Sequence, residues 1–176
     1  MSGVNATLYS HAARCGSGLL DAADLGDEAK VRECLQMVGA DVNQRGRFGR
    51  SALFLGVRNG SLAVVQAVLE AGADIEQKND HGFSPLYAAC LYNRPEILAY
   101  LADSEADLHA ADLGGLTPLH ITAEKGYAGI LANLLSRGAS TTLLDSIGHT
   151  PLFWAKLKGH EECVQLLEGV GVSNSP

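Results

Sequence analysis

The sequence predicts an all-α solenoid built from stacked helix–turn–helix repeats. The first observation behind this prediction is a Ser/Thr-x-Leu tripeptide that recurs every 33 residues. These tripeptides begin at Ser51, Ser84, Thr117 and Thr150. An apolar series keeps the same period: Leu35, Val68, Leu101, Leu134 and Leu167. Self-similarity at such a period is the signature of a repeat array, in which each repeat buries its apolar face against its neighbours.

Each tripeptide marks the start of the first helix of a repeat. The Ser or Thr side chain can accept a hydrogen bond from a free N–H group at the helix N-terminus. In three of the four repeats a proline follows, and its fixed φ and missing N–H suit the first helical turn. We expect this helix to end where the backbone turns left-handed, at Gly60, Gly126 and Gly159.

A second helix follows in each repeat. Paired apolar residues, with another three or four positions later, predict its buried stripe: Val64 and Val65, Ile97 and Leu98, Ile130 and Leu131. Gly72, Ala73 and Asp74 break this helix. An extended stretch and a polar turn around Gly82 then lead to the next repeat.

Two motifs resemble the ankyrin repeat family: Thr-Pro-Leu-His from Thr117 to His120, and Gly-Ala-Asp-Val-Asn from Gly39 to Asn43. The resemblance covers roughly residues 16 to 172 and includes the 33-residue period. It implies stacked helix–turn–helix repeats with β-hairpin fingers projecting at one edge.

Five repeats are predicted, with atypical capping repeats at both ends. Their boundaries are 16–45, 46–78, 79–111, 112–144 and 145–172, and we expect residues 1–15 and 173–176 to be loosely ordered. The third repeat departs from the pattern, because Asn93 and Glu105 stand where glycine is usual. Asn tolerates the left-handed region, so we expect the helix break to survive in a less regular repeat.

Composition and motifs argue against several functional classes. The net charge is −7 and no apolar run approaches the roughly 20 residues of a spanning helix. Four cysteines lie far apart without a CxxC pair, which predicts reduced core cysteines rather than a metal site. No titratable pair has a catalytic spacing, and His120 is expected to hydrogen-bond its own turn and the adjacent finger. The sequence therefore predicts a non-catalytic protein without metal or cofactor, in the cytoplasm or nucleus.

The resemblance implies that recognition residues lie on the fingers and on the inner helices that face the concave side. Carried over by register, the predicted partner-binding residues are Arg45, Arg47, Phe48, Arg50, Arg58, Lys78, His81, Phe83, Leu91, Tyr92, Leu113, Leu116, Lys125, Ile147, His149, Leu157 and Lys158. Across all positions of this register, seven residues are basic and two, Asp80 and Glu124, are acidic.

This face carries a formal charge of +5, which leaves −12 for the rest of a chain whose net charge is −7. Arginine and exposed aromatic residues are common in the energetic centres of protein interfaces. We therefore expect an adaptor or scaffold, monomeric by default, that binds an acidic partner segment with apolar anchors.

Two alternatives remain open at this point. The chain could inhibit an enzyme such as a protein kinase, because Phe48 to Leu53 is similar to the second repeat of ankyrin-type inhibitors of cyclin-dependent kinases. Those inhibitors shorten the first helix of that repeat, whereas Leu53 to Gly60 keeps its full length here. The arginine cluster could instead follow a nucleic-acid backbone, although the surrounding negative charge opposes this.

Asn43 is a further candidate site, for modification rather than for binding. It lies eight residues after Leu35 in an Asp-Val-Asn turn. The resemblance implies that an asparaginyl hydroxylase could act there.

Overall fold

The computed structural model describes residues 18–172, and the predictions for residues 1–15 and 173–176 lie outside the described residues. The chain forms two compact units, which join in sequence between Asp80 and His81. Residues 18–80 are called the N-terminal unit below, and residues 81–172 the C-terminal unit.

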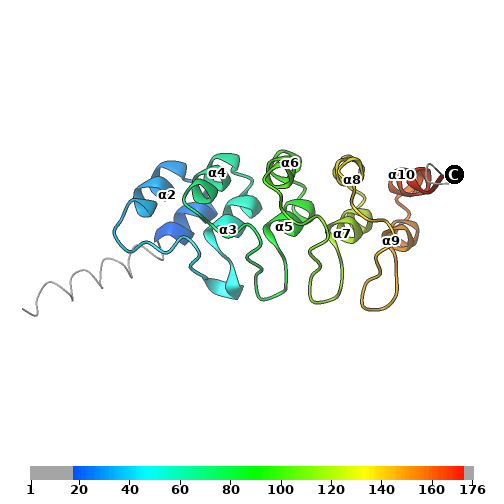
Figure 1. Cartoon of the computed structure of the whole chain (residues 1–176), viewed down its shortest axis with the longest axis horizontal. Coiled ribbons are helices and arrows are strands. Elements are labelled where there is room, and N and C mark those ends of the chain that lie inside the picture. Colours follow the sequence, from blue (N-terminus) through cyan, green and yellow to red (C-terminus); the bar gives the residue numbers. More distant parts are fainter. Residues whose placement is uncertain (1–17, 173–176) are drawn as a thin grey trace, which may run out of the picture. The chain divides into compact units, whose positions relative to one another are not determined.

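Two helix pairs make up the described part of the N-terminal unit (Figure 1). Residues 18–25 are helical and pair with α2 (Glu28–Leu35), and α3 (Ala52–Asn59) pairs with α4 (Leu62–Glu70). The outer helices α2 and α4 pack against each other.

Three helix pairs make up the described part of the C-terminal unit (Figure 1). The inner helices are α5 (Pro85–Leu91), α7 (Pro118–Lys125) and α9 (Pro151–Lys158), and each packs on the next. The outer helices are α6 (Pro95–Asp103), α8 (Ala128–Ser136) and α10 (Glu161–Val172). This arrangement confirms the predicted all-α array of stacked helix pairs.

The predicted capping chemistry is present at the inner helices. Ser51, Ser84, Thr117 and Thr150 each accept a hydrogen bond from the backbone N–H three residues later. In α5, α7 and α9 proline occupies the first turn. The glycines that cap α3, α7 and α9 have φ of 92°, 74° and 74°, as a left-handed helix end requires.

The third repeat is less regular, as expected. Asn93 and Glu105 have φ of 54° and 64°, so both accept the left-handed backbone where glycine is usual. The inner helix α5 has seven residues, whereas α7 and α9 have eight.

The core includes most of the predicted apolar series and the described cysteines. Val68, Leu101 and Leu134 are fully buried, and Leu167 is 4% exposed. Leu35 is half-buried, because the charged helix α2 buries Val31 and Cys34 instead. Cys90 and Cys163 are also buried and free, whereas Cys15 lies outside the described residues.

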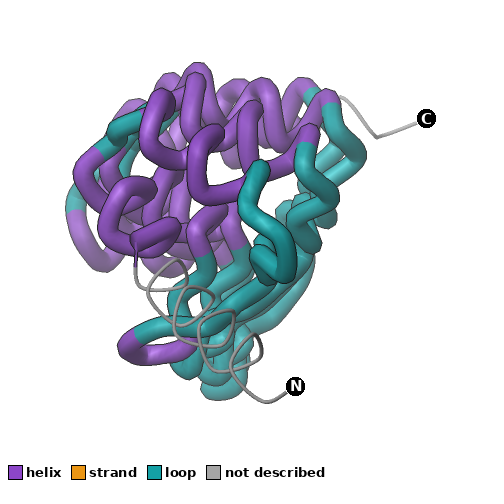
Figure 2. Tube along the Cα trace, turned by 90° about the vertical axis from the view of Figure 1, so that its left-hand side faces the viewer, coloured by secondary structure: helices purple, strands orange, loops and turns teal. Residues whose placement is uncertain are grey.

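Hairpin-like loops, the fingers, connect successive repeats; Figure 2 shows them beside the helices, mostly as loop, and the first finger also contains the short 3-10 helix η1 (Arg47–Gly49). The first finger (residues 46–50) is closed by a hydrogen bond from the Gly46 N–H to the Arg50 carbonyl. The fingers at residues 112–116 and 145–149 close in the same way. Within residues 18–172 no β-strand forms, because one such bond per finger is too short a ladder for a strand.

A second recurring contact, a hydrogen bond outside the fingers, also joins successive repeats. The Asn43 side-chain oxygen accepts a hydrogen bond of 2.8 Å from the Asp74 N–H. At the equivalent place two repeats later, His109 Nε2 accepts one of 3.0 Å from the Ser140 N–H. Asn43 therefore has a structural role in the array.

Candidate functional site

A pocket of about 460 Å³ opens between the first finger and the inner helices of the N-terminal unit. Its lining residues are Leu20, Asp21, Asp24, Gly46, Arg47, Phe48, Arg50, Leu55 and Arg58. Four predicted partner-binding residues, namely Arg47, Phe48, Arg50 and Arg58, thus line a single pocket.

Phe48 stands on the first finger with an unusual backbone. Its φ and ψ are 59° and 29°, in the left-handed region that a non-glycine residue enters at a cost of about 1–2 kcal/mol. The side chain is nevertheless 53% exposed, so burial of the ring does not account for this conformation. The guanidinium carbon of Arg50 lies 5.0 Å from the centre of the ring, within the range of a cation–π contact.

The local sequence explains why this finger differs from the others. Gly46 stands at the register position that Asp112 and Asp145 occupy in the later fingers. Each of those carboxylates accepts hydrogen bonds from the backbone N–H groups two and four residues later. Gly46 has no such acceptor, and a Cβ there would meet Leu20 Cδ1 at 2.7 Å. Leu20 thus fills the place of the missing side chain.

The arginines of this unit differ in their partners. Arg45 pairs with Asp80 at 2.8 Å, and Arg58 pairs with Asp24. Among the described residues, neither Arg47 nor Arg50 has a carboxylate partner within ion-pair distance. The Arg50 Nε atom is buried and has no hydrogen-bond partner in the described part of the chain. Lys78, the remaining predicted basic residue of this unit, is exposed.

In the C-terminal unit, three of the predicted residues are strongly exposed apolar side chains. Leu113 and Ile147 on the fingers are 79% and 66% exposed, and Leu157 on α9 is 59% exposed. The tips of these two fingers are joined by a hydrogen bond from the Ser146 N–H to the Gly114 carbonyl. Leu91, Tyr92 and Leu116 are half-buried.

Most of the other predicted residues of this unit make contacts within the array. Phe83 stacks on Tyr87 with 4.6 Å between ring centres, and His81 tilts against Phe83. Lys125 is exposed, whereas Lys158 lies 3.6 Å from Glu124. The structure therefore places these residues both at the surface and in packing contacts.

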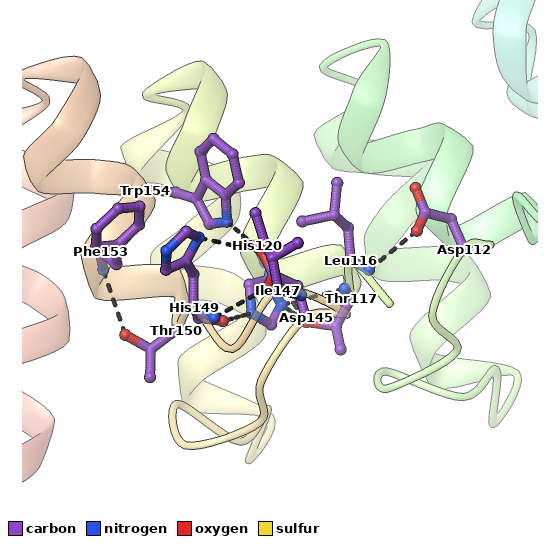
Figure 3. Close-up of polar contacts among 10 residues, drawn as sticks. All are labelled: Asp112, Leu116, Thr117, His120, Asp145, Ile147, His149, Thr150, Phe153 and Trp154. Carbon is purple, nitrogen blue, oxygen red and sulfur yellow. Dashed lines mark hydrogen bonds and ion pairs between the residues drawn. The ribbon is translucent and has the colours of Figure 1, made fainter. Parts of the chain in front are cut away.

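His120 has the structural role expected from its motif, and it is completely buried (Figure 3). The Thr117 N–H donates to His120 Nδ1 at 3.1 Å, so Nε2 carries the proton and donates to the His149 carbonyl at 3.0 Å. Burial lowers the pKa of His120 from its usual 6.5, although the hydrogen bond to His149 opposes this shift.

Asp145 organises the last finger (Figure 3). Its carboxylate accepts hydrogen bonds from the Ile147 and His149 N–H groups and from Trp154 Nε1. Burial opposes the charge of Asp145, but these hydrogen bonds outweigh it and hold the pKa of the carboxyl below its usual value. The His149 ring stacks on Phe153 with 3.7 Å between ring centres.

Two surface residues escaped the sequence analysis. Leu25 is 79% exposed and lies 33 residues before Arg58, at the same register position of the first repeat. Extending the register to that repeat would have found it. Phe153 is 39% exposed and stands at the position of His120, one repeat later.

Within the described residues no group of three or more His, Cys, Asp or Glu side chains could hold a metal ion. The buried Cys90 thiol has its pKa raised to about 12 by desolvation, so it is a poor nucleophile. No helix of the described chain has the length and apolar character needed to cross a bilayer.

A family model described as ankyrin repeats in three copies matches residues 19–112 and 105–174. No curated protein matches the sequence significantly. The match agrees with the 33-residue period, the cap geometry and the helix pairs of both units. The chain therefore belongs to the ankyrin repeat family.

Proposed function

We propose that this chain is a non-catalytic adaptor or scaffold that binds a partner protein through its fingers and inner helices. Ankyrin repeats generally serve as protein–protein interaction modules, and no catalytic family matches the chain. The observation that carries the proposal is Phe48, a half-exposed aromatic residue on a strained backbone beside a pocket. Strain of this kind concentrates at functional sites, where a binding role can offset its cost.

The apolar surface of the C-terminal unit supports the same proposal. Leu113, Ile147 and Leu157 are all more than half exposed, at positions that vary between repeats. Exposed large apolar side chains on recurring surface positions are typical of protein interaction sites.

The alternatives receive less support from the geometry. For nucleic acid, two of the four clustered arginines, Arg45 and Arg58, are already paired with carboxylates. The inhibitor hypothesis is not favoured by the second repeat, because α3 keeps eight residues, as α7 and α9 do.

Affinity capture read by mass spectrometry tests the proposal. The wild type is compared with Phe48→Ser and with an Ile147→Ser, Leu157→Ser double variant. Val38→Ser is the matched control, because Val38 is 91% exposed but follows α2 and is not among the residues that line the pocket. Circular dichroism checks that every variant is folded.

We expect wild type and Val38→Ser to capture the same specific proteins, and at least one of the other two variants to lose them. If all variants capture the same proteins as the wild type, the fingers and inner helices are not the binding surface.

A further inference from the structure

We propose that the N-terminal pocket binds an acidic side chain of the partner together with a neighbouring bulky apolar side chain. The occupant is thus a peptide segment in which Glu or Asp stands next to a residue such as Leu. This inference rests on the proposed function and names the chemistry that one part of the surface recognises.

The acidic half of the proposal follows from Arg50. Arg50 and Arg47 both line the pocket, and neither has a carboxylate partner within ion-pair distance among the described residues. A guanidinium presents its donors as a planar fork that matches a carboxylate, so a partner carboxylate in the pocket would pair with Arg50.

Charge at the pocket favours the same occupant. Arg58 is neutralised by its ion pair with Asp24. The remaining charged lining residues are Arg47, Arg50 and Asp21, which leaves one net positive charge for a single carboxylate. An extended phosphate backbone would bring several negative charges against Asp21 and Asp24, so the pocket suits a peptide better than a nucleic acid.

The apolar half of the proposal follows from the other lining residues. Leu20, Leu55 and the Phe48 ring contribute apolar surface to the pocket. A volume of about 460 Å³ lies within the range of small-ligand pockets, about 300–1,000 Å³, and has room for a bulky side chain.

The pocket is also fixed in advance of binding. Phe48 and Gly49 both have left-handed backbones, and the Phe48 carbonyl accepts a hydrogen bond of 3.0 Å from the Asp80 N–H. The guanidinium carbon of Arg50 lies over the rings of Phe48 and Phe54, at 5.0 and 6.0 Å from their centres. Such pre-ordering reduces the entropy that a partner must overcome on binding.

Nitrogen-15 NMR of the full chain tests the proposal, because arginine Nε–H groups give their own resonances. The probes are three capped tetrapeptides: acetyl-Gly-Glu-Leu-Gly-amide, its Gln-Leu analogue and its Glu-Gly analogue. Arg50→Lys identifies the Arg50 signal and also keeps the charge while removing the fork. Lys156→Gln is the control, because it removes one exposed positive charge from the C-terminal unit.

We expect the Glu-Leu peptide to shift the Arg50 Nε–H signal and to bind at least about tenfold more tightly than either analogue, since charge-assisted hydrogen bonds are the stronger ones. Arg50→Lys should weaken binding of the Glu-Leu peptide about tenfold, followed through neighbouring backbone amides, whereas Lys156→Gln should leave it unchanged.

The proposal is overturned if the Glu-Leu peptide leaves the Arg50 signal in place, or if the Gln-Leu analogue binds equally well. A response to a thymidine decanucleotide but not to the peptides would overturn it in favour of nucleic acid. The proposed function is tested separately by affinity capture. It fails if Phe48→Ser and the Ile147→Ser, Leu157→Ser double variant capture the same proteins as the wild type, whatever the peptides show.

Discussion

Replacing His120 with alanine should destabilise the fold by about 3–4 kcal/mol. The ring is fully buried, accepts a hydrogen bond from the Thr117 N–H and donates one to the His149 carbonyl. Loss of these two bonds costs about 1 kcal/mol each, because both partners stay behind without the ring. The cavity left by the imidazole adds about 1–2 kcal/mol.

The assay is urea unfolding, followed by circular dichroism and by the fluorescence of Trp154, the chain's single tryptophan. His160→Ala is the matched control, because His160 is half-buried and its Nε2 contacts one carbonyl, that of Glu124, at 2.9 Å. We expect the control to lower the free energy of unfolding by about 1–2 kcal/mol. If His120→Ala lowers it no more than His160→Ala does, the assigned role of His120 as a link between repeats is wrong.

Burial lowers the pKa of His120 in the folded chain, so its contribution to the free energy of unfolding should be fully present above pH 6.5, the usual pKa of histidine. This contribution should be lost as the pH falls below that value, because the unfolded chain then binds the proton more readily. Urea titrations at several pH values should show this loss in the wild type and not in His120→Ala. Asn43→Ala removes the acceptor of the Asp74 N–H and should lower the free energy of unfolding by about 1 kcal/mol in the same assay. A change near zero would contradict the structural role of Asn43 between repeats. Hydroxylation of Asn43 stays a prediction, which a mass increase of one oxygen atom on its peptide would support. Cys90 should resist iodoacetamide at pH 8 until urea unfolds the chain, because burial raises its pKa to about 12; rapid labelling of the folded protein would contradict its burial.

The fold was predictable because its determinants are local and recur. Ser84 and Thr117 cap helices by the same hydrogen bond that their side chains suggest in the sequence. Asn93 takes the left-handed backbone that its side chain tolerates. At each of these positions the repeat period and the side-chain chemistry predict the same local structure. The prediction therefore needed no knowledge of contacts between repeats.

The N-terminal pocket was only partly predictable. Register placed Arg47, Phe48 and Arg50 on one face, but the pocket depends on Leu20, which comes from the preceding repeat and takes the place of a side chain that Gly46 lacks. Because the Leu20 side chain of one repeat replaces a side chain missing from the next, the sequence shows no periodic pattern that would predict the pocket. The ion pair of Arg58 with Asp24 was likewise not readable from the sequence, because it joins residues 34 positions apart.

Photo-crosslinking would locate the partner on the chain itself. The photoreactive residue p-benzoylphenylalanine replaces Phe48 in one variant and Val38 in another, both of which are exposed positions of the N-terminal unit. If the fingers and inner helices bind the partner, position 48 should crosslink to a specific protein and position 38 should not. Crosslinks from position 38 with none from position 48 would contradict this account and place the binding surface on the other side of the repeats.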